Sequence, residues 1–363
     1  MNTLKTLPEN LKNKAQSLIS SVNMTLPKTF KAAVFEKAGG PLVIKDLELQ
    51  EPKANEILVK VIACGVCHSD AVVQAGSFGN GFPIVPGHEI IGTVAAVGPG
   101  AEKWKVGARV GGPWHGGHDG TCKQCNRGNF QMCSNAAING VTRNGGFAEY
   151  VHLRTEAAVR VPEDVDPFKY APILCAGITV FNSMRKLHIT PGEVVAIQGL
   201  GGLGHLAVQY AAKMGFKVVA ISGGDKKREF AHKLGAHEYV DASKEDPAKK
   251  LAELGGAALI VCTAPNPKSI SPLTAGLGPG GKLLILAPCG DVEINTVELI
   301  MKAASVCGFP AGHALDSEEA IEFTKLHNVD CMIEKFPLKD AQKAYDHMLN
   351  GDVRFRSVLV MDE

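Results

Sequence analysis

Cysteine and histidine recur in this chain at spacings that suit a catalytic metal. Residues Cys67–Asp70 read Cys-His-Ser-Asp, and His88 follows Cys67 by 21 positions. Thiolate and imidazole are preferred zinc ligands, and a catalytic zinc needs three protein ligands and one open position. Cys175, 87 positions beyond His88, could be the third ligand. Neither composition nor spacing pairs Cys175 with the other two.

A second group has the spacing D-x2-C-x2-C-x7-C and consists of Asp119, Cys122, Cys125 and Cys133. Because a carboxylate can bind zinc, three thiolates and one aspartate predict a Cys3Asp zinc site that folds a loop rather than doing chemistry. His118 is the neighbouring alternative ligand. The other interpretation is a metal-free lobe with three free thiols.

The remaining cysteines give no further pattern. The chain has 10 cysteines in 363 residues, and clustering of this kind indicates metal ligands rather than a disulfide framework. Cys262, Cys289 and Cys307 lie in or beside apolar runs and are expected to be buried thiols.

A glycine-rich turn at Gly199–Gly204 reads G-L-G-G-L-G and follows a predicted strand. In a dinucleotide-binding turn Gly199 would make the tight bend, Gly201 would let the backbone approach the pyrophosphate, and Gly204 would let helix and strand pack closely. The helix that begins near Gly202 and Leu203 would present free N–H groups to the phosphates. An ordinary glycine-rich turn is the alternative.

The end of the next strand bears on the choice between NADP(H) and NAD(H). An acid there would bind the adenosine ribose of NAD, but this chain has Ser222. Lys226, Lys227 and Arg228 could attract a 2′-phosphate, so we favour NADP(H). NAD(H) stays open, because the cations could form a solvated helix face and Asp225 could turn toward the ribose.

Two different patterns of elements must hold these residues. Short strands with glycine and proline turns from about Phe30 to Val161 predict a β-barrel with long functional loops. From Glu193 the pattern alternates strand and helix, which predicts a doubly wound parallel α/β sheet. After about Gly312 the chain is expected to run helix, strand, helix, strand, and to end near Met361.

Composition limits the class of protein. A length of 363 residues predicts about two domains, and 45% hydrophobic with 21% charged residues fits a globular protein. A net charge of +1 favours neither nucleic acid nor membrane as a partner, and we find no apolar run of the ~18 residues that span a bilayer. Residues 1–27 are expected to be an added leader of a cytoplasmic protein. A mitochondrial transit segment is the alternative, although this stretch contains no arginine.

Four motifs in this order resemble the zinc-dependent alcohol dehydrogenases of the medium-chain dehydrogenase/reductase superfamily, of the yeast and bacterial type with features of cinnamyl alcohol dehydrogenases. The motifs are Gly65–Asp70, Gly87–Glu89, Leu174–Thr179 and Gly199–Gly204. The resemblance extends from about Phe30 to Met361. It implies a GroES-like catalytic domain in two pieces, 28–177 and 312–363, around a Rossmann cofactor domain at 178–311.

The resemblance also implies roles for single residues. Cys67, His88 and Cys175 would bind the catalytic zinc, Glu89 would lie beside it, and Asp70 would orient His88. Ser69 would relay the substrate proton. His68 and Arg356 would contact the cofactor pyrophosphate, and Phe78 and Trp114 would line an apolar substrate pocket.

This chain departs from the family pattern at two positions. The histidine that usually continues the proton relay is replaced by Val72, so the proton must leave through water, the cofactor ribose or another base. Asp119 stands where the family has the first of four cysteines of a structural zinc site.

The resemblance therefore implies hydride transfer between a primary aliphatic, allylic or aromatic alcohol or aldehyde and NAD(P), in a homo-oligomer that is a tetramer or a dimer. Rival interpretations are a polyol dehydrogenase, a zinc-free quinone reductase and a catalytically silent protein that binds cofactor and zinc. Cys175 argues against the polyol enzymes, and the complete ligand set argues against the other two.

Overall fold

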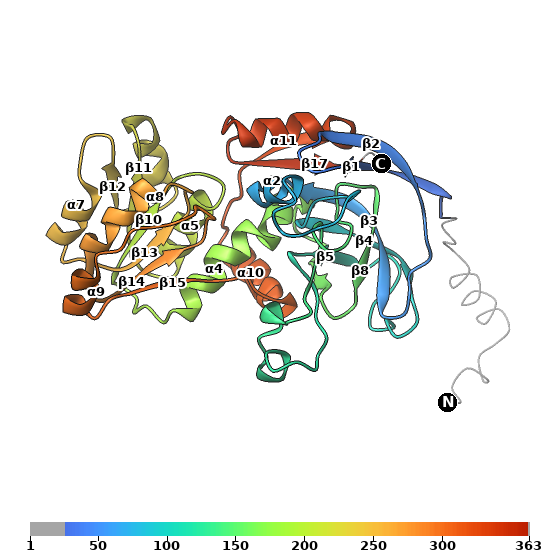
Figure 1. The fold of residues 1–363 in the computed structure, drawn as a ribbon, viewed down its shortest axis with the longest axis horizontal. Coiled ribbons are helices and arrows are strands. Elements are labelled where there is room, and N and C mark those ends of the chain that lie inside the picture. The colour runs from blue at the N-terminus through green and yellow to red at the C-terminus, as the bar shows by residue number, and fades with distance from the viewer. Residues whose placement is uncertain (1–25, 362–363) are drawn as a thin grey trace.

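The computed structural model describes residues 26–361, so all but the last two residues of the predicted leader lie outside the described part. The described chain forms two large sheets at opposite ends of the molecule, with α4 (Ala176–Lys186) and α10 (Ala314–Leu326) between them (Figure 1).

A six-stranded sheet in which every paired strand is parallel follows α4 in the chain. Its order, β12-β11-β10-β13-β14-β15, reverses the direction of winding beside β10, as in doubly wound dinucleotide-binding sheets. The prediction of a parallel α/β sheet is confirmed. The strands are β10 (Val194–Gln198), β11 (Lys217–Ser222), β12 (Glu238–Asp241), β13 (Ala257–Cys262), β14 (Leu277–Ile285) and β15 (Ser305–Gly308).

Helices cover both faces of this sheet because its strands are apolar on both sides. Val195 and Ile197 of β10 belong to a core shared with α5, whereas Ala196 belongs to a core shared with α7. The helices of this half are α5 (Gly204–Lys213), α6 (Arg228–Lys233), α7 (Pro247–Glu253), α8 (Pro267–Ile270) and α9 (Thr296–Lys302). Since α5 begins at Gly204, Gly202 and Leu203 remain in the turn before it.

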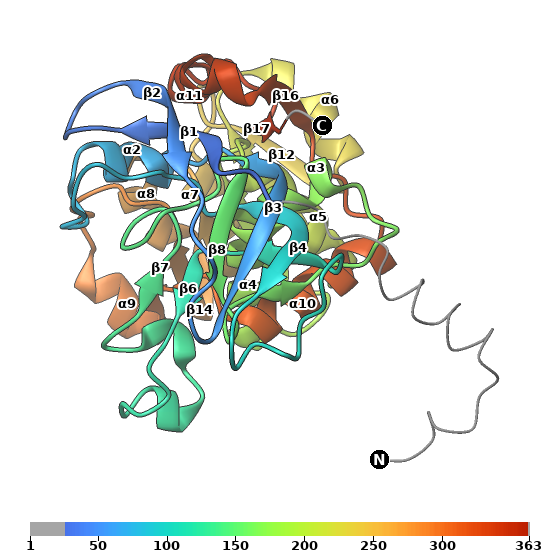
Figure 2. The same cartoon turned by 90° about the vertical axis from the view of Figure 1, so that its right-hand side faces the viewer.

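The second large sheet is built from both ends of the described chain. β17 pairs antiparallel with β3, so the C-terminal segment returns to the sheet formed by the N-terminal half (Figure 2). Its strands are β3 (Glu56–Gly65), β4 (Ile90–Val97), β5 (Arg109–Gly112), β8 (Tyr150–Arg154), β9 (Val159–Arg160), β16 (Ile333–Pro337) and β17 (Arg356–Val360).

Smaller elements complete this half. Two short sheets are formed by β1 (Thr29–Phe35) with β2 (Leu42–Glu48) and by β6 (His115–Gly117) with β7 (Ala137–Ile138), and the helices are α2 (His68–Gln74), α3 (Pro167–Tyr170) and α11 (Ala341–Leu349). The return of β16 and β17 agrees with a catalytic domain in two pieces, although the limits at 177/178 and 311/312 stay predictions.

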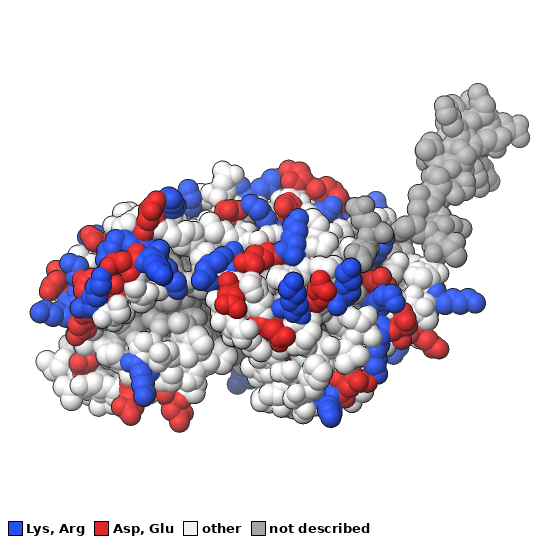
Figure 3. Space-filling view, turned by 90° about the horizontal axis from the view of Figure 1, so that it is seen from above, with Lys and Arg blue, Asp and Glu red and all other residues white. Residues whose placement is uncertain are grey.

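The surface carries charges of both signs. On the face shown in Figure 3, lysine and arginine alternate with aspartate and glutamate, and neither sign dominates. Within residues 26–361, none of the helices combines the length and apolar character needed to cross a bilayer.

Candidate active site

Four side chains from three separate segments meet between the two halves of the molecule. Cys67 caps the N-terminus of α2, His88 and Glu89 precede β4, and Cys175 caps the N-terminus of α4. Their ligand atoms all lie within 4.8 Å of one another. The fold thus brings Cys175 to Cys67 and His88, a pairing that spacing alone could not supply.

The chemistry of this cluster fits a bound cation. Both ring nitrogens of His88 are buried without a hydrogen-bond partner, and so is Oε2 of Glu89. The sulfurs of Cys67 and Cys175 lie 3.9 Å apart, and this contact lowers the pKa of Cys67 well below its ordinary value in spite of burial. Two thiols that share a proton, beside an imidazole with no partner, form a donor set that a zinc ion would satisfy.

Asp70 lies behind this donor set. Its Oδ2 accepts a hydrogen bond from the Cys67 backbone N–H at 2.9 Å, and its Oδ1 lies 3.5 Å from Nδ1 of His88. The carboxylate is fully buried, and it can fix both the start of α2 and the orientation of the imidazole.

A buried ion pair connects the ligand cluster to the C-terminal segment. Glu89 pairs with Arg356, the first residue of β17, and Arg356 is only 3% exposed. Burial raises the pKa of Glu89 to about 7, while the Arg356 guanidinium acts in the opposite direction. The pair connects the cluster to the glycine loop, because Arg356 also lies against that loop.

Three of the four glycines of the loop occupy positions where a side chain would be crowded or strained. Gly199 has φ +93°, and a Cβ on Gly204 would lie 1.9 Å from the Gly199 carbonyl oxygen. A Cβ on Gly202 would lie 2.9 Å from Nη1 of Arg356. Gly201 has open space on its Cα, which leaves room for a ligand to approach the backbone.

A cavity of about 540 Å³ runs from the ligand cluster to this loop. Twelve of the residues that the sequence singled out line it. They are Cys67, His68, Ser69, Val72, Cys175, Gly199, Gly201, Gly202, Leu203, Ser222, Lys227 and Arg356. Thr179, Thr263 and Leu286 also line it. Thr179 ends the motif Leu174–Thr179 but was given no role there, and Thr263 and Leu286 lie outside the four motifs.

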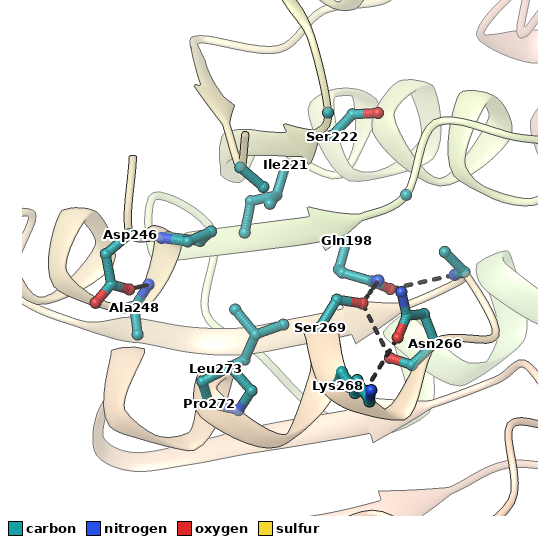
Figure 4. Close-up of a pocket in the computed structure, with 15 residues that line it drawn as sticks. Gln198, Ile221, Ser222, Asp246, Ala248, Asn266, Lys268, Ser269, Pro272 and Leu273 are labelled. Atoms are coloured by element: carbon teal, nitrogen blue, oxygen red, sulfur yellow. Dashed lines mark hydrogen bonds between the residues drawn. The ribbon is translucent and has the colours of Figure 1, made fainter. Parts of the chain in front are cut away.

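A second cavity of about 500 Å³ continues past Gly199 and Ser222, which line both spaces. Gln198 lines it; the amide nitrogen of Gln198 donates to the Ser269 hydroxyl at 2.9 Å, and its Oε1 accepts from the Ala264 N–H at 3.1 Å (Figure 4). Together the two cavities form an elongated space at the carboxyl ends of the parallel strands, where ligands of such sheets bind.

The cations after β11 have different surroundings. Lys227 lines the cavity together with Ser222, whereas Lys226 is exposed and lies outside it. Arg228 is bound to the Asp225 carboxylate and to the Tyr239 carbonyl, so it is not free to meet a ligand. Asp225 also forms an ion pair with Lys244.

The two predicted pocket aromatics lie on the far side of His88. Trp114 packs edge-on against the His88 ring at 4.8 Å, and Phe78 packs against Trp114 at 5.5 Å. Neither ring is among the residues that line the 540 Å³ cavity, and Phe78 is 43% exposed. The two rings could therefore contact a ligand only at the end of the cleft near His88.

The second predicted group also comes together. The ligand atoms of Asp119, Cys122, Cys125 and Cys133 lie within 4.8 Å of one another. Backbone N–H groups point at the sulfurs, as at thiolate sites: the Cys125 N–H donates to Cys122 at 3.5 Å and lowers the pKa of Cys122 to about 6. This donor set fits a zinc ion.

Asp119 has a second task in this lobe. Its Oδ1 accepts hydrogen bonds from the N–H groups of Cys122 and Thr121, which lower the pKa of Asp119 well below its usual range. The alternative ligand His118 lies outside the cluster, since its ring stacks on Phe130 at 4.3 Å.

Comparisons with known proteins agree with this arrangement. A family model described as Alcohol dehydrogenase GroES-like domain matches residues 53–163, and one described as Zinc-binding dehydrogenase matches residues 202–326. The chain is 58% identical over 337 residues to the alcohol dehydrogenase patD of Penicillium expansum, which covers 93% of this chain and 99% of the relative.

More distant proteins share the same architecture. An alcohol dehydrogenase of Geobacillus stearothermophilus is 35% identical over 337 residues, with 92% of this chain and 99% of the relative covered. Among solved structures, a cinnamyl alcohol dehydrogenase of Sorghum bicolor superposes with a TM-score of 0.84 at 30% identity, over 92% of this chain and 98% of that chain.

Proposed function

Since this chain belongs to the zinc-dependent alcohol dehydrogenases of the medium-chain superfamily, we propose that it exchanges a hydride between a primary alcohol or aldehyde and NADP(H). The family assignment makes it an NAD(P)-dependent oxidoreductase with zinc, a GroES-like domain and a Rossmann sheet. The observation that carries the proposal is the cluster of two thiols and one imidazole whose cysteines line the 540 Å³ cleft together with the glycine loop.

The catalytic zinc is proposed to be held by Cys67, His88 and Cys175. When bound, zinc acts as a Lewis acid on the substrate oxygen, and the nicotinamide exchanges hydride with the adjacent carbon. Asp70 orients His88 from behind, in keeping with the 3.5 Å contact between them. Glu89 stays close to the metal while its charge is opposed by Arg356.

Ser69 is proposed to carry the substrate proton, because its hydroxyl lines the cleft beside Cys67. Val72, one turn later on α2, lines the same cleft and cannot accept a proton. The proton therefore leaves through water, the cofactor ribose or another base. His68 and Arg356 are proposed to hold the pyrophosphate above the glycine loop, where both line the cleft.

The preference for NADP(H) rests on charge. Ser222 ends β11 without a carboxylate, and Lys227 lines the cleft beside it. A carboxylate about 4 Å from a 2′-phosphate would cost a few kcal/mol at an effective dielectric near 20, and Ser222 avoids that cost. Of the three cations predicted here, Lys227 is the one we assign to the phosphate; Lys226 could act only from the surface.

A second zinc in the Asp119 lobe is proposed to have a structural role. Three sulfurs and one carboxylate complete four ligands, which leaves no open position for a substrate.

An apolar aldehyde or alcohol is the proposed substrate. Val72 and Leu286 line the same cleft as Cys175, and Trp114 packs against His88 with Phe78 behind it. These surroundings suit aliphatic, allylic or aromatic groups better than polyols.

Self-association is also proposed, on the evidence of α9. Its charged residues face the chain's own domain, where Glu298 accepts from Thr274 and Lys302 donates to the Ala275 carbonyl. Three of its four large apolar residues face outward: Val297 is 65% exposed, Ile300 76% and Met301 79%. A second copy would cover this apolar face of α9, the helix that directly precedes the edge strand β15 in the chain. A cytoplasmic location remains part of the proposal.

The test of the whole proposal is zinc content per chain together with catalytic efficiency on cinnamaldehyde and hexanal with NADPH and with NADH. We expect two zinc ions per chain and a higher efficiency with NADPH. Zinc-loaded protein that reduces no aldehyde would instead support the catalytically silent alternative.

A further inference from the structure

His205, the second residue of α5, is a buried imidazole that uses both ring nitrogens. Nδ1 lies 3.2 Å from the Gly201 carbonyl oxygen, and Nε2 accepts the Met332 backbone N–H at 3.3 Å. The ring is fully buried, and burial lowers its pKa to about 4, so it is neutral at physiological pH. A neutral ring with its hydrogen on Nδ1 satisfies both contacts at once. One side chain thus joins the glycine loop to the segment before β16.

The connection continues from Met332 to the cleft. The Met332 carbonyl accepts the backbone N–H groups of Phe355 and Arg356, each at 3.1 Å. The Phe355 ring also stacks on the His205 ring, with centroids 4.9 Å apart and planes 14° apart, and on Phe230 at 5.0 Å. The backbone that carries Arg356 is therefore fixed by contacts that originate at His205.

Arg356 returns this chain of contacts to the glycine loop. Its side chain lies so close to Gly202 that a Cβ there would stand 2.9 Å from Nη1. The contacts thus run from Gly201 through His205 and Met332 to Arg356 and back to Gly202. A pyrophosphate must fit between the loop and the guanidinium. A small shift of any of these contacts would therefore misalign the loop and Arg356, the two groups that bind the pyrophosphate.

A role in merely attaching α5 to the other half does not require His205. Gln209, one turn further along α5, already makes two hydrogen bonds with the Asp330 backbone, at 2.8 and 2.9 Å. The Gln209 side chain donates a further hydrogen bond to the His205 carbonyl at 3.0 Å, within the same helix, and among the described residues it makes none with the glycine loop or with Met332. What His205 adds to this attachment is the link between the loop and the segment that carries Arg356.

We propose that His205 is a positioning residue for the cofactor: it holds Arg356 in register with the glycine loop and thereby sets the affinity for the nicotinamide dinucleotide. This inference rests on the proposed binding of the dinucleotide at the glycine loop. It concerns affinity and not the chemical step, because His205 does not line the cleft.

The test is direct binding of NADPH and NADH, followed by nucleotide fluorescence, to the zinc-loaded protein. His205→Leu should raise Kd about tenfold, the effect of losing one or two buried hydrogen bonds, and should leave the aldehyde KM unchanged. His205→Gln, whose amide oxygen can still accept the Met332 N–H, should recover most of the affinity. Gln209→Leu, the matched control on the same helix, should change Kd less than twofold.

A double-substitution cycle separates positioning from general packing. If His205 acts through Arg356, then adding His205→Leu to Arg356→Gln should raise Kd little beyond the single Arg356 change. Additive effects would overturn the inference, and so would an unchanged Kd in His205→Leu.

Two further outcomes separate the role of His205 from a folding defect and from failure of the proposed function. If His205→Leu does not fold, Phe355→Leu gives the same test, since it removes the stack and keeps the imidazole; an unchanged Kd there overturns the inference. If the unaltered protein binds neither nucleotide, the proposed function itself fails. Unaltered binding with no effect of either substitution removes only the role of His205.

Discussion

Lys226 and Lys227 are sequence neighbours in different surroundings, and that difference makes a prediction about the cofactor. Lys227 lines the cleft with Ser222, and Lys226 is exposed to solvent. A partly solvated cation near a phosphate contributes about 1–2 kcal/mol. Lys227→Ala should therefore lower the ratio of catalytic efficiencies, NADPH over NADH, about tenfold.

The matched control for this prediction is Lys226→Ala, which removes the same charge one position earlier. Its efficiency ratio should stay within about twofold of the unaltered protein if only the cation in the cleft contacts the phosphate. Equal losses in the two variants would mean that the general positive potential matters, and that no single contact selects the cofactor.

A second prediction at this scale concerns Asp119. Its carboxylate is the one oxygen donor beside three sulfurs. Asp119→Ala removes a ligand and two hydrogen bonds of the turn, so zinc per chain should fall from two to one and the Tm should fall by several degrees. Asp119→Cys should keep both zinc ions. Elemental analysis measures the metal, and a full second equivalent in Asp119→Ala would rule out this carboxylate as a necessary ligand.

The next scale is the element, and α9 is the helix whose polarity is reversed relative to an ordinary surface helix. If a second copy covers its apolar face, Ile300→Glu should place a charge in that interface and release chains of 38.4 kDa. Sedimentation velocity measures this. Leu326→Glu, on α10 with 75% of the leucine exposed, is the control and should leave the mass unchanged. A monomeric unaltered protein would contradict the proposed self-association.

Strands and helices were predictable in the parallel half because period and turn residues agree there. The run Val194–Ile197 falls within β10, and the charged run after Ser222 leads into α6. The start of α5 was placed two residues early, because the glycine motif extends the turn to Gly204. The helix α9 was not predicted: its exposed face is apolar, so no amphipathic pattern marks it against its surroundings.

The members of the candidate site were predictable from residue type, but their meeting was not. Cys67, His88 and Cys175 come from three segments whose approach depends on packing of Ala171–Leu174, which directly precedes Cys175, against β3 and β4. Spacing carries no information about such packing, so the resemblance alone paired them. His205 and Phe355 were missed for a related reason. Each looks like an ordinary core residue until the tail segment is placed against α5.

On the scale of the whole molecule, the two halves are joined where the cleft is. α5 packs on the parallel sheet, whereas Met332 and Phe355 lie in the C-terminal segment that returns to the second large sheet. Because the imidazole at this junction is neutral, the free energy of unfolding of the whole chain depends on pH. In the folded chain the pKa of His205 is about 4, with burial as the largest cause, and Arg356 lowers it further while Asp330 opposes the shift. The ordinary value for an unfolded histidine is 6.5.

The sign of the pH effect follows from proton uptake. Below about pH 6.5 the His205 ring binds a proton in the unfolded chain, whereas in the folded chain it does so only near pH 4. The free energy of unfolding therefore falls as pH is lowered between these values. From pH 7 to pH 4.5 this group should remove about 2–3 kcal/mol. His205→Gln cannot titrate, so its urea midpoint should fall less than that of the unaltered protein over the same interval. Because every other group is shared, the difference between the two pH profiles isolates His205, and parallel profiles would mean that this imidazole is not held neutral at the junction.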